Sequence, residues 1–331
     1  MAARPLPDEF ALIARYFAPL AAGAPGAFDL TDDVAIVEVG PNEQLVVKTD
    51  AIVAGIHFLP NDPPDLIGRK LLRVNLSDLA GKGARPLGYL LTCAFPPDLD
   101  EAWIAQFVGG LAADQREFGL SLRGGDTTAT PGPLTLSATL FGAIGKGRLP
   151  WRGAAKAGDA VLVSGTLGDG ALGLDVQRQE FAELDATGRA HLMERYRLPQ
   201  PRLRLGRALV EAGLVHAAMD ISDGLLADLG HICRTSRLGA TVEWPRVPLS
   251  APAAKLVAAR PQLRERIIAG GDDYELLLTV SGDDVAAALA LAQRSGTALV
   301  PIGQMSAGSG VRIRDENGAE IATGRAGYRH F

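Results

Sequence analysis

Apolar residues in this chain recur with two spacings, and the alternation between them predicts a mixed α/β protein. One predicted helix covers residues 7–17 and has a single apolar face, made of Phe10, Ile13, Ala14 and Phe17. Further helices are expected over 65–73, 100–118, 202–212, 251–258 and 284–294. Apolar runs with a strand-like pattern are expected over 35–39, 44–49, 87–95, 134–144, 160–164, 276–280 and 298–302. Helices and strands therefore interleave along the whole chain.

The length of 331 residues exceeds what one hydrophobic core usually organises, so two domains are expected. The apolar fraction of 47% is sufficient for a buried core in each. A new strand begins after Lys156-Ala157-Gly158-Asp159, which favours a division into residues 1–150 and 151–331.

Charge and cysteine content exclude several classes of protein. The net charge is −5 and no basic run is present, which argues against a nucleic-acid partner. Cys93 and Cys233 form neither a disulfide framework nor a zinc motif, as is typical of a reducing compartment. No apolar run reaches the length of a membrane span, and Asp8 and Glu9 argue against a secretory signal. We expect a soluble cytoplasmic protein with no membrane partner.

The acidic residues indicate the chemistry, because they recur at the ends of strands and in glycine turns rather than along one solvated face. Carboxylates without accompanying His or Cys favour Mg²⁺, and a magnesium site with open positions suits a polyphosphate substrate. No convincing nucleophile motif is present, and phosphoryl transfer does not require one. The residues concerned are Asp32, Asp33, Asp50, Asp78, Asp126, Asp220, Asp223, Asp272 and Asp273.

Each of these positions also has a purely structural interpretation. Asp78, before Gly81-Lys82-Gly83, is either a helix cap or a metal ligand. One of Asp32 and Asp33 could coordinate while the other caps, and Ser222 or Asp223 could cap the helix that follows. The Gly-Gly-Asp turns also occur in ordinary hairpins. The glycine turn at 165–170 resembles a phosphate cradle but lacks the P-loop lysine, so a tight start of the next helix is favoured there.

Taken together, the motifs resemble those of the thiamine-monophosphate kinase family, which shares an ATP-binding superfamily with aminoimidazole ribonucleotide synthetase and selenophosphate synthetase. The resemblance covers nearly the whole chain, and the order and spacing of its motifs are specific. The motifs are Glu9-Phe10, Asp32-Asp33-Val34-Ala35, Thr49-Asp50 to His57-Phe58, Asn75-Leu76-Ser77-Asp78-Leu79-Ala80, Gly124-Gly125-Asp126-Thr127-Thr128, Asp220-Ile221-Ser222-Asp223-Gly224-Leu225, Gly271-Asp272-Asp273-Tyr274-Glu275-Leu276 and Gly327-Tyr328-Arg329-His330-Phe331.

The resemblance implies roles for individual residues. Contacts to thiamine phosphate would come from His57, Asp272 and Tyr328, and contacts to ATP from Gly125, Asp126, Arg152 and Ser222. The magnesium ligands would be Asp33, Lys48, Thr49, Asp50, Asp78, Asp126, Asp220 and Asp223. Two positions depart from the family pattern: Thr31 replaces a usual glycine, and Lys48 replaces a small polar residue, so Lys48 would contribute its backbone carbonyl.

The fold and activity implied by the resemblance are likewise expectations. The fold would be the two-domain architecture of aminoimidazole ribonucleotide synthetase, with an N-terminal domain forming a β-barrel at a homodimer interface and a C-terminal α/β domain. The reaction would be ATP-dependent phosphorylation of thiamine monophosphate to thiamine diphosphate, with several Mg²⁺ ions; a requirement for K⁺ stays open. The alternatives are another ATP-using synthetase of the superfamily and a non-catalytic nucleotide-binding protein.

Overall fold

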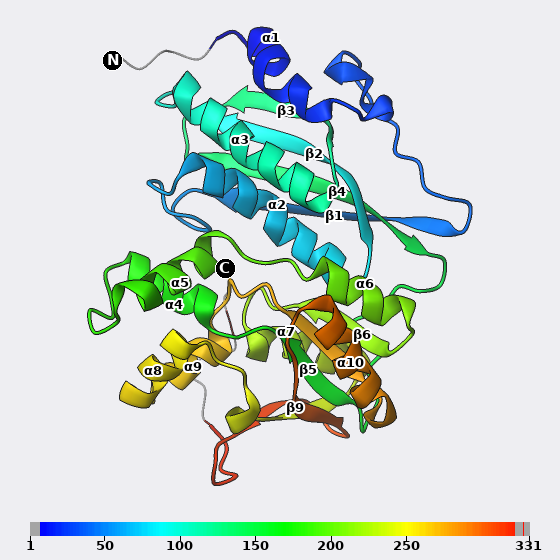
Figure 1. Ribbon diagram of the computed structural model, residues 1–331, viewed down its shortest axis with the longest axis vertical. Coiled ribbons are helices and arrows are strands. Elements are labelled where there is room, and N and C mark those ends of the chain that lie inside the picture. Colours follow the sequence, from blue (N-terminus) through cyan, green and yellow to red (C-terminus); the bar gives the residue numbers. More distant parts are fainter. Residues whose placement is uncertain (1–6, 322–326, 328–331) are drawn as a thin grey trace. The chain divides into compact units, whose positions relative to one another are not determined.

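The computed structural model describes residues 7–321 and 327, and the chain divides into two compact units. The first unit comprises Met1–Leu79 and Ala84–Lys146, and the second comprises Ala80–Gly83 and Gly147–Phe331. Each unit combines one β-sheet with helices (Figure 1). The mixed α/β fold with two domains is therefore confirmed. None of the helices in the described residues has both the length and the apolar character needed to cross a bilayer.

The first unit is a four-stranded sheet in the order β1-β4-β2-β3. Strands β1 and β2 each pair antiparallel with β4, whereas β2 and β3 run parallel. Because β1 and β3 are both edges, the sheet of one chain is open, and the β-barrel predicted for this domain is not closed within the chain. The strands are β1 (Glu43–Val53), β2 (Arg85–Phe95), β3 (Leu122–Ala129) and β4 (Thr135–Gly145).

Two long helices, α2 (Pro64–Gly81) and α3 (Glu101–Phe118), pack on one face of this sheet (Figure 1). Helix α3 begins where predicted, because the Asp100 carboxylate accepts a hydrogen bond from the Trp103 N–H at 2.8 Å. The buried Asp114 carboxylate of α3 accepts hydrogen bonds from Arg73 and Arg69 of α2. The two helices are thus joined by ion pairs as well as by apolar contacts.

The prediction that helix 65–73 ends before Val74 was wrong, because α2 continues to Gly81. Leu72, Leu76 and Leu79 are all at most 1% exposed, and their spacing is helical. The predicted strand over 35–39 was also wrong, since that segment has no regular structure; the Ile36 N–H donates to the Gly26 carbonyl. The N-terminal helix was only partly right: α1 (Glu9–Leu12) continues as a π-helical turn over Ile13–Phe17.

The second unit has a six-stranded sheet in the order β10-β7-β9-β5-β8-β6, in which only β10 and β7 are paired parallel. The strands are β5 (Ala160–Ser164), β6 (Val215–Asp220), β7 (Gly239–Glu243), β8 (Leu276–Val280), β9 (Leu299–Ser306) and β10 (Gly310–Arg314). The helices are α4 (Asp169–Gln177), α5 (Ala186–Arg197), α6 (Leu203–Glu211), α7 (Leu225–Ser236), α8 (Ala251–Ala259), α9 (Leu263–Ala269) and α10 (Val285–Ser295). Sequence patterns did not predict α5, α9, β6, β7 or β10.

Candidate functional site

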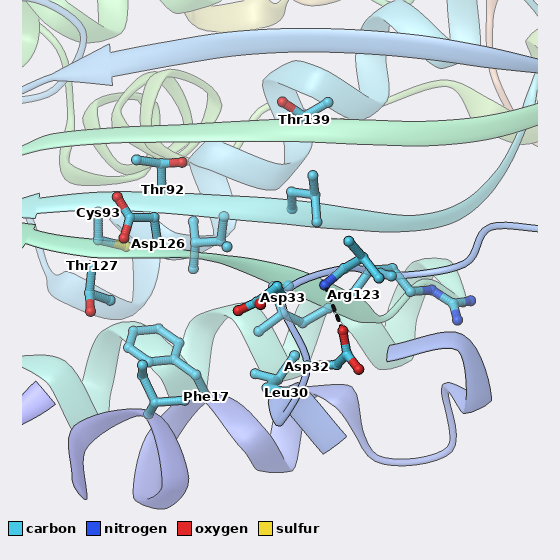
Figure 2. Close-up of a pocket in the computed structure, with 18 of the residues that line it drawn as sticks. Phe17, Leu30, Asp32, Asp33, Thr92, Cys93, Arg123, Asp126, Thr127 and Thr139 are labelled. Atoms are coloured by element: carbon cyan, nitrogen blue, oxygen red, sulfur yellow. Dashed lines mark hydrogen bonds between the residues drawn. The ribbon is translucent and has the colours of Figure 1, made fainter. Parts of the chain in front are cut away.

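The first unit contains a cavity of about 670 Å³, bounded by β2, β3, β4 and the segment that precedes β1 (Figure 2). A volume of this size suits a small-molecule ligand. Its wall includes apolar side chains such as Phe17 and Leu30 and several oxygen donors. The polar side chains that line it are Asp32, Asp33, Thr92, Arg123, Asp126, Thr127 and Thr139.

A tight turn brings the first aspartate pair to the cavity. The Asp32 carboxylate accepts a hydrogen bond from the Val34 N–H at 3.2 Å, so this side chain folds back onto its own turn. Asp33 lies beside it in the cavity wall and faces the same space (Figure 2). Asp32 therefore has the structural role that the sequence left open for one member of the pair. Thr31, at the usual glycine position, caps the preceding turn by donating its hydroxyl to the Phe28 carbonyl at 2.7 Å.

Strand β3 brings the Gly124-Gly125-Asp126 motif to the same cavity. Gly125 has no room for a side chain, because a Cβ there would lie 1.8 Å from the Leu91 carbonyl oxygen. Asp126 is paired in register with Thr92 and is exposed. Burial, together with the charge of Asp126, raises the pKa of the neighbouring Cys93 thiol. This cysteine is therefore an inert core residue rather than a nucleophile.

A second group of predicted ligands lies around Lys48. The Lys48 Nζ is 3.0 Å from Asp50 Oδ1 and 2.8 Å from Asp78 Oδ2. Lys48 and Asp50 project from the same face of β1, and Asp78 projects from α2. Burial opposes the lysine charge, but the two carboxylates outweigh it and raise the pKa of Lys48. Since Asp78 lies in the last turn of α2 and does not precede a helix, the interpretation of this residue as a helix N-cap was wrong.

The register of the sheet separates this group from Asp126. The row of paired residues that contains Asp50 runs through Ala138 and Leu91 to Gly125. Asp126 is the next residue along β3, so its side chain points to the opposite face. Thr49, one residue before Asp50, also lies on that opposite face, where its hydroxyl accepts a hydrogen bond from Thr139 at 3.0 Å.

His57, a predicted substrate contact, is fixed at the end of β1. Its Nδ1 accepts a hydrogen bond from the Val53 N–H at 3.1 Å. Its carbonyl oxygen accepts from the buried Lys70 ammonium at 2.8 Å. The ring is thus held by the backbone of β1, and the His57 backbone is held by a side chain of α2.

In the second unit, an unpredicted residue organises the loop that carries Ser222 and Asp223. One oxygen of the Asp228 carboxylate accepts hydrogen bonds from the N–H groups of Ser222, Asp223 and Gly224 at 3.0–3.1 Å. Burial, followed by the charge of Asp223, raises the pKa of Asp228 to about 7. Gly224 is the N-cap of α7, so neither Ser222 nor Asp223 is in the capping position. Asp220 ends β6 just before this loop and is buried.

The loop from Gly270 to Glu275 lies against the Asp220–Gly224 loop. The Asp272 N–H donates to the Ser222 carbonyl at 3.0 Å, and a Cβ on Gly271 would lie 2.2 Å from that same oxygen. Asp272 and Tyr274 both adopt left-handed backbone conformations, with φ of 72° and 52°. Such conformations are strained in non-glycine residues, so the surrounding contacts must hold them.

Two buried carboxylates supply these contacts. Asp273 accepts hydrogen bonds from the Gly168 and Gly170 N–H groups, and burial raises its pKa well above the usual range. The Glu275 carboxylate is 0% exposed and accepts from Ser164, Arg195 and Arg202. Arg195 and Arg202 were missed in the sequence because nothing local connects them to residue 275.

A second cavity, of about 330 Å³, adjoins this loop. It is lined by Gln262, Glu265, Arg266, Ala269, Gly270, Gly271 and Gly327. Gly271 directly precedes the predicted substrate residue Asp272. Tyr328, which follows Gly327, lies outside the described residues.

Arg152, a predicted ATP contact, also lies in the second unit, near α7. The pKa of His231 in that helix is lowered by burial and by the charges of Arg234 and Arg152. Among the residues that the structure describes, no three His, Cys, Asp or Glu side chains are grouped closely enough to hold a metal ion. Any divalent ion would therefore need further ligands, such as phosphate oxygens and water.

Comparison with known proteins gives a consistent result along the chain. Residues 31–144 match the family model of the AIR synthase related protein N-terminal domain, and residues 156–316 match that of its C-terminal domain. The chain is 42% identical over 329 residues to a thiamine-monophosphate kinase of Caulobacter vibrioides, covering 98% of this chain and 91% of the relative.

Solved structures are similar over most of their length. The crystal structure of thiamine-monophosphate kinase from Stenotrophomonas maltophilia K279a has a TM-score of 0.79 and 39% identity, covering 88% of this chain and 90% of that one. The structure of AaThiL complexed with AMPPCP and TMP has a TM-score of 0.77 and 28% identity, covering 98% of this chain and 97% of that one.

Proposed function

Because the chain belongs to the thiamine-monophosphate kinase family, we propose that it transfers the γ-phosphoryl group of ATP to the phosphate of thiamine monophosphate. The products are thiamine diphosphate and ADP. The near-full-length similarity to curated thiamine-monophosphate kinases carries this proposal. The similar chain that was solved with AMPPCP and TMP supports ATP as the donor and thiamine monophosphate as the acceptor.

The acceptor oxygen belongs to a phosphate that is already anionic near neutral pH, so no general base is required. Catalysis then depends on bringing two anions together and on compensating their charge. The cavity in the first unit suits the nucleotide: Phe17 and Leu30 offer an apolar wall for a base, and the exposed Gly125 and Asp126 of β3 line the same space. Arg152 and Ser222 in the second unit would contact ATP, as the family resemblance implies.

Several Mg²⁺ ions would compensate the charge of the phosphates, and the donors present fit this ion. The polar side chains of the first cavity include hydroxyls and carboxylates, without imidazole, and Mg²⁺ prefers such oxygen donors. Asp33 and Asp126 would hold metal at the cavity. On the other face of the sheet, metal would be held by Asp50 and Asp78 together with the backbone of Lys48 and Thr49. In the second unit, it would be held by Asp220 and Asp223. We also propose that K⁺ supports turnover, which the assay below can test by omitting K⁺.

The second cavity would accept part of thiamine monophosphate. Asp272 adjoins it, and its strained backbone is anchored on both sides, which suits a residue that must keep one orientation. His57 and Tyr328 would complete the substrate contacts. Because ATP is the phosphate donor, we place the reaction in the cytoplasm, where the buried free thiols of Cys93 and Cys233 would stay reduced.

The exposed side of β1 supports a homodimer. Within the described part of the chain β1 is an edge strand, and Leu45 and Val47 on it are 41% and 57% exposed. Open edges and apolar patches of this kind are usually covered in native assemblies. We propose that two copies meet here and that their open sheets together close the barrel expected from the family.

The decisive experiment incubates the purified chain with MgATP, K⁺ and thiamine monophosphate and quantifies thiamine diphosphate and ADP chromatographically. We expect both products in equal amounts, and neither when thiamine monophosphate is omitted. ATP-dependent thermal stabilisation without product would favour the non-catalytic nucleotide-binding alternative. Formation of ADP without thiamine diphosphate would favour another ATP-using synthetase of the superfamily.

A further inference from the structure

The ion-pair group formed by Lys48, Asp50 and Asp78 has an unusual composition for a predicted metal site. A cation already lies between two of the predicted magnesium ligands, at hydrogen-bond distance from both: 3.0 Å to Asp50 and 2.8 Å to Asp78. The two carboxylates come from different elements, β1 and α2. The lysine therefore joins the middle of β1 to the last turn of α2.

This group differs from an ordinary surface ion pair. The side chains of Lys48, Asp50 and Asp78 are 27%, 44% and 30% exposed, so each is partly withdrawn from water. Their face of β1 is also apolar, because the residues paired with Lys48 and Asp50 on β4 are Leu140 and Ala138, both 0% exposed. Two carboxylates beside such a surface are costly unless a cation compensates them.

Charge and distance make an ammonium and a divalent ion alternatives at this point. Two carboxylates carry a formal charge of −2, which one divalent ion would balance and which one lysine reduces to −1. Mg²⁺ binds oxygen at about 2.0–2.1 Å, whereas here both oxygens are spaced around a nitrogen at hydrogen-bond distance. Both cations cannot occupy the same gap, so the lysine excludes the ion as long as it stays in place.

We propose that the Lys48 ammonium takes the place of one divalent ion between Asp50 and Asp78. This inference rests on the proposed function, because that function makes the two carboxylates metal ligands. Lys48 is then a positioning residue: it holds Asp50 and Asp78 together in place of that ion, through one oxygen of each carboxylate, and other ions would bind the second oxygens. The remaining ions would reach the site with ATP, bound to its phosphates.

The test counts bound metal rather than activity. Binding of Mn²⁺ alone is measured by electron paramagnetic resonance of the free ion, for the wild type, Lys48→Met and Lys48→Arg. Lys48→Met removes the charge with little change of length, and we expect it to gain one Mn²⁺ site, with affinity at least tenfold above that of the wild type for an ion at this position. Lys48→Arg keeps the charge and should match the wild type.

Three further variants make the result specific. Lys146→Met removes a lysine charge from an exposed position of the same unit, where Nζ donates to the Pro41 carbonyl at 2.7 Å, and should leave Mn²⁺ binding unchanged. Lys48→Met combined with Asp78→Asn should lose the additional site. Lys48→Gln gives a second neutral side chain of similar length if the methionine variant does not fold.

Equal Mn²⁺ stoichiometry and affinity in the wild type and both neutral variants would overturn the inference. Its failure is separable from failure of the proposed function. If thiamine diphosphate forms but the neutral variants gain no Mn²⁺, the kinase proposal stands and the role of Lys48 is wrong. If the neutral variants gain a site but no variant forms product, the role of Lys48 stands and the kinase proposal is wrong.

Discussion

Glu275 holds the loop that carries Asp272, and its removal tests how that loop is stabilised. The carboxylate is fully buried and accepts from Ser164 Oγ at 2.5 Å, from Arg195 at 2.7 Å and from Arg202 at 2.7 and 2.5 Å. Glu275→Gln keeps the shape and one carbonyl oxygen but removes the negative charge. Two guanidinium groups, with side chains only 12% and 22% exposed, then lose their counter-charge.

The expected loss is about 3 kcal/mol of the free energy of unfolding of the second unit. Breaking a buried ion pair by removing one partner typically costs about 3–5 kcal/mol, and the retained amide oxygen favours the lower end. With a urea slope of about 1–3 kcal/mol/M, the midpoint of unfolding should fall by about 1–3 M. A loss of this size would reduce the ratio of folded to unfolded protein by about two orders of magnitude.

The assay is urea unfolding followed by tryptophan fluorescence. Of the three tryptophans, Trp244 is buried in the core of the second unit. A background with Trp103→Phe and Trp151→Phe makes the signal specific for that unit. The control is Glu211→Gln, which removes the charge from an exposed pair with Arg207 whose side chains are 61% and 50% exposed. It should cost no more than about 0.5 kcal/mol.

The reasoning would be refuted if Glu275→Gln lowered the free energy of unfolding by less than about 1 kcal/mol, or by no more than the control. The two arginines would then be adequately compensated by solvent or by other groups. At urea-free conditions, where the variant is still folded, we also expect a higher KM for thiamine monophosphate than in the wild type. The KM for ATP should change less, because Asp272 rather than the cavity of the first unit is affected.

Two further predictions concern the first unit. Asp78→Asn should lower turnover by about 10²-fold or more, because the variant loses a charge that binds Lys48 and is proposed to bind metal, while the circular dichroism spectrum stays unchanged. The control is Asp98→Asn, which changes an exposed carboxylate of the same unit, and normal turnover of Asp78→Asn would contradict the proposed metal site. Val47→Asp should shift the chain from dimer to monomer in sedimentation-velocity experiments, because a symmetric interface at β1 would bury two carboxylates. The control, Phe10→Asp, changes a side chain of α1 that is 80% exposed and should remain dimeric. A dimeric Val47→Asp would exclude β1 as the interface.

Local sequence patterns were sufficient to predict the helices and strands whose apolar spacing is regular. The helix over 100–118 was predicted correctly because Asp100 caps it and its apolar spacing is regular over 18 residues. The apolar run at 160–164 was predicted as a strand and is β5. The order and spacing of the short motifs also indicated the family, since these motifs are contiguous in sequence. The individual metal, ATP and substrate roles stay predictions.

Only the tertiary structure decided which of these residues meet. Val74–Leu76 belongs to helix α2, which the sequence predicted to end at residue 73, because a short apolar run fits more than one periodicity until packing selects one. The register places Asp126 and Asp50 on opposite faces of one sheet, although the resemblance implies that both are magnesium ligands. Partners far along the chain, such as Arg195 and Arg202 for Glu275, have no local signal, because the fold alone brings their charges together.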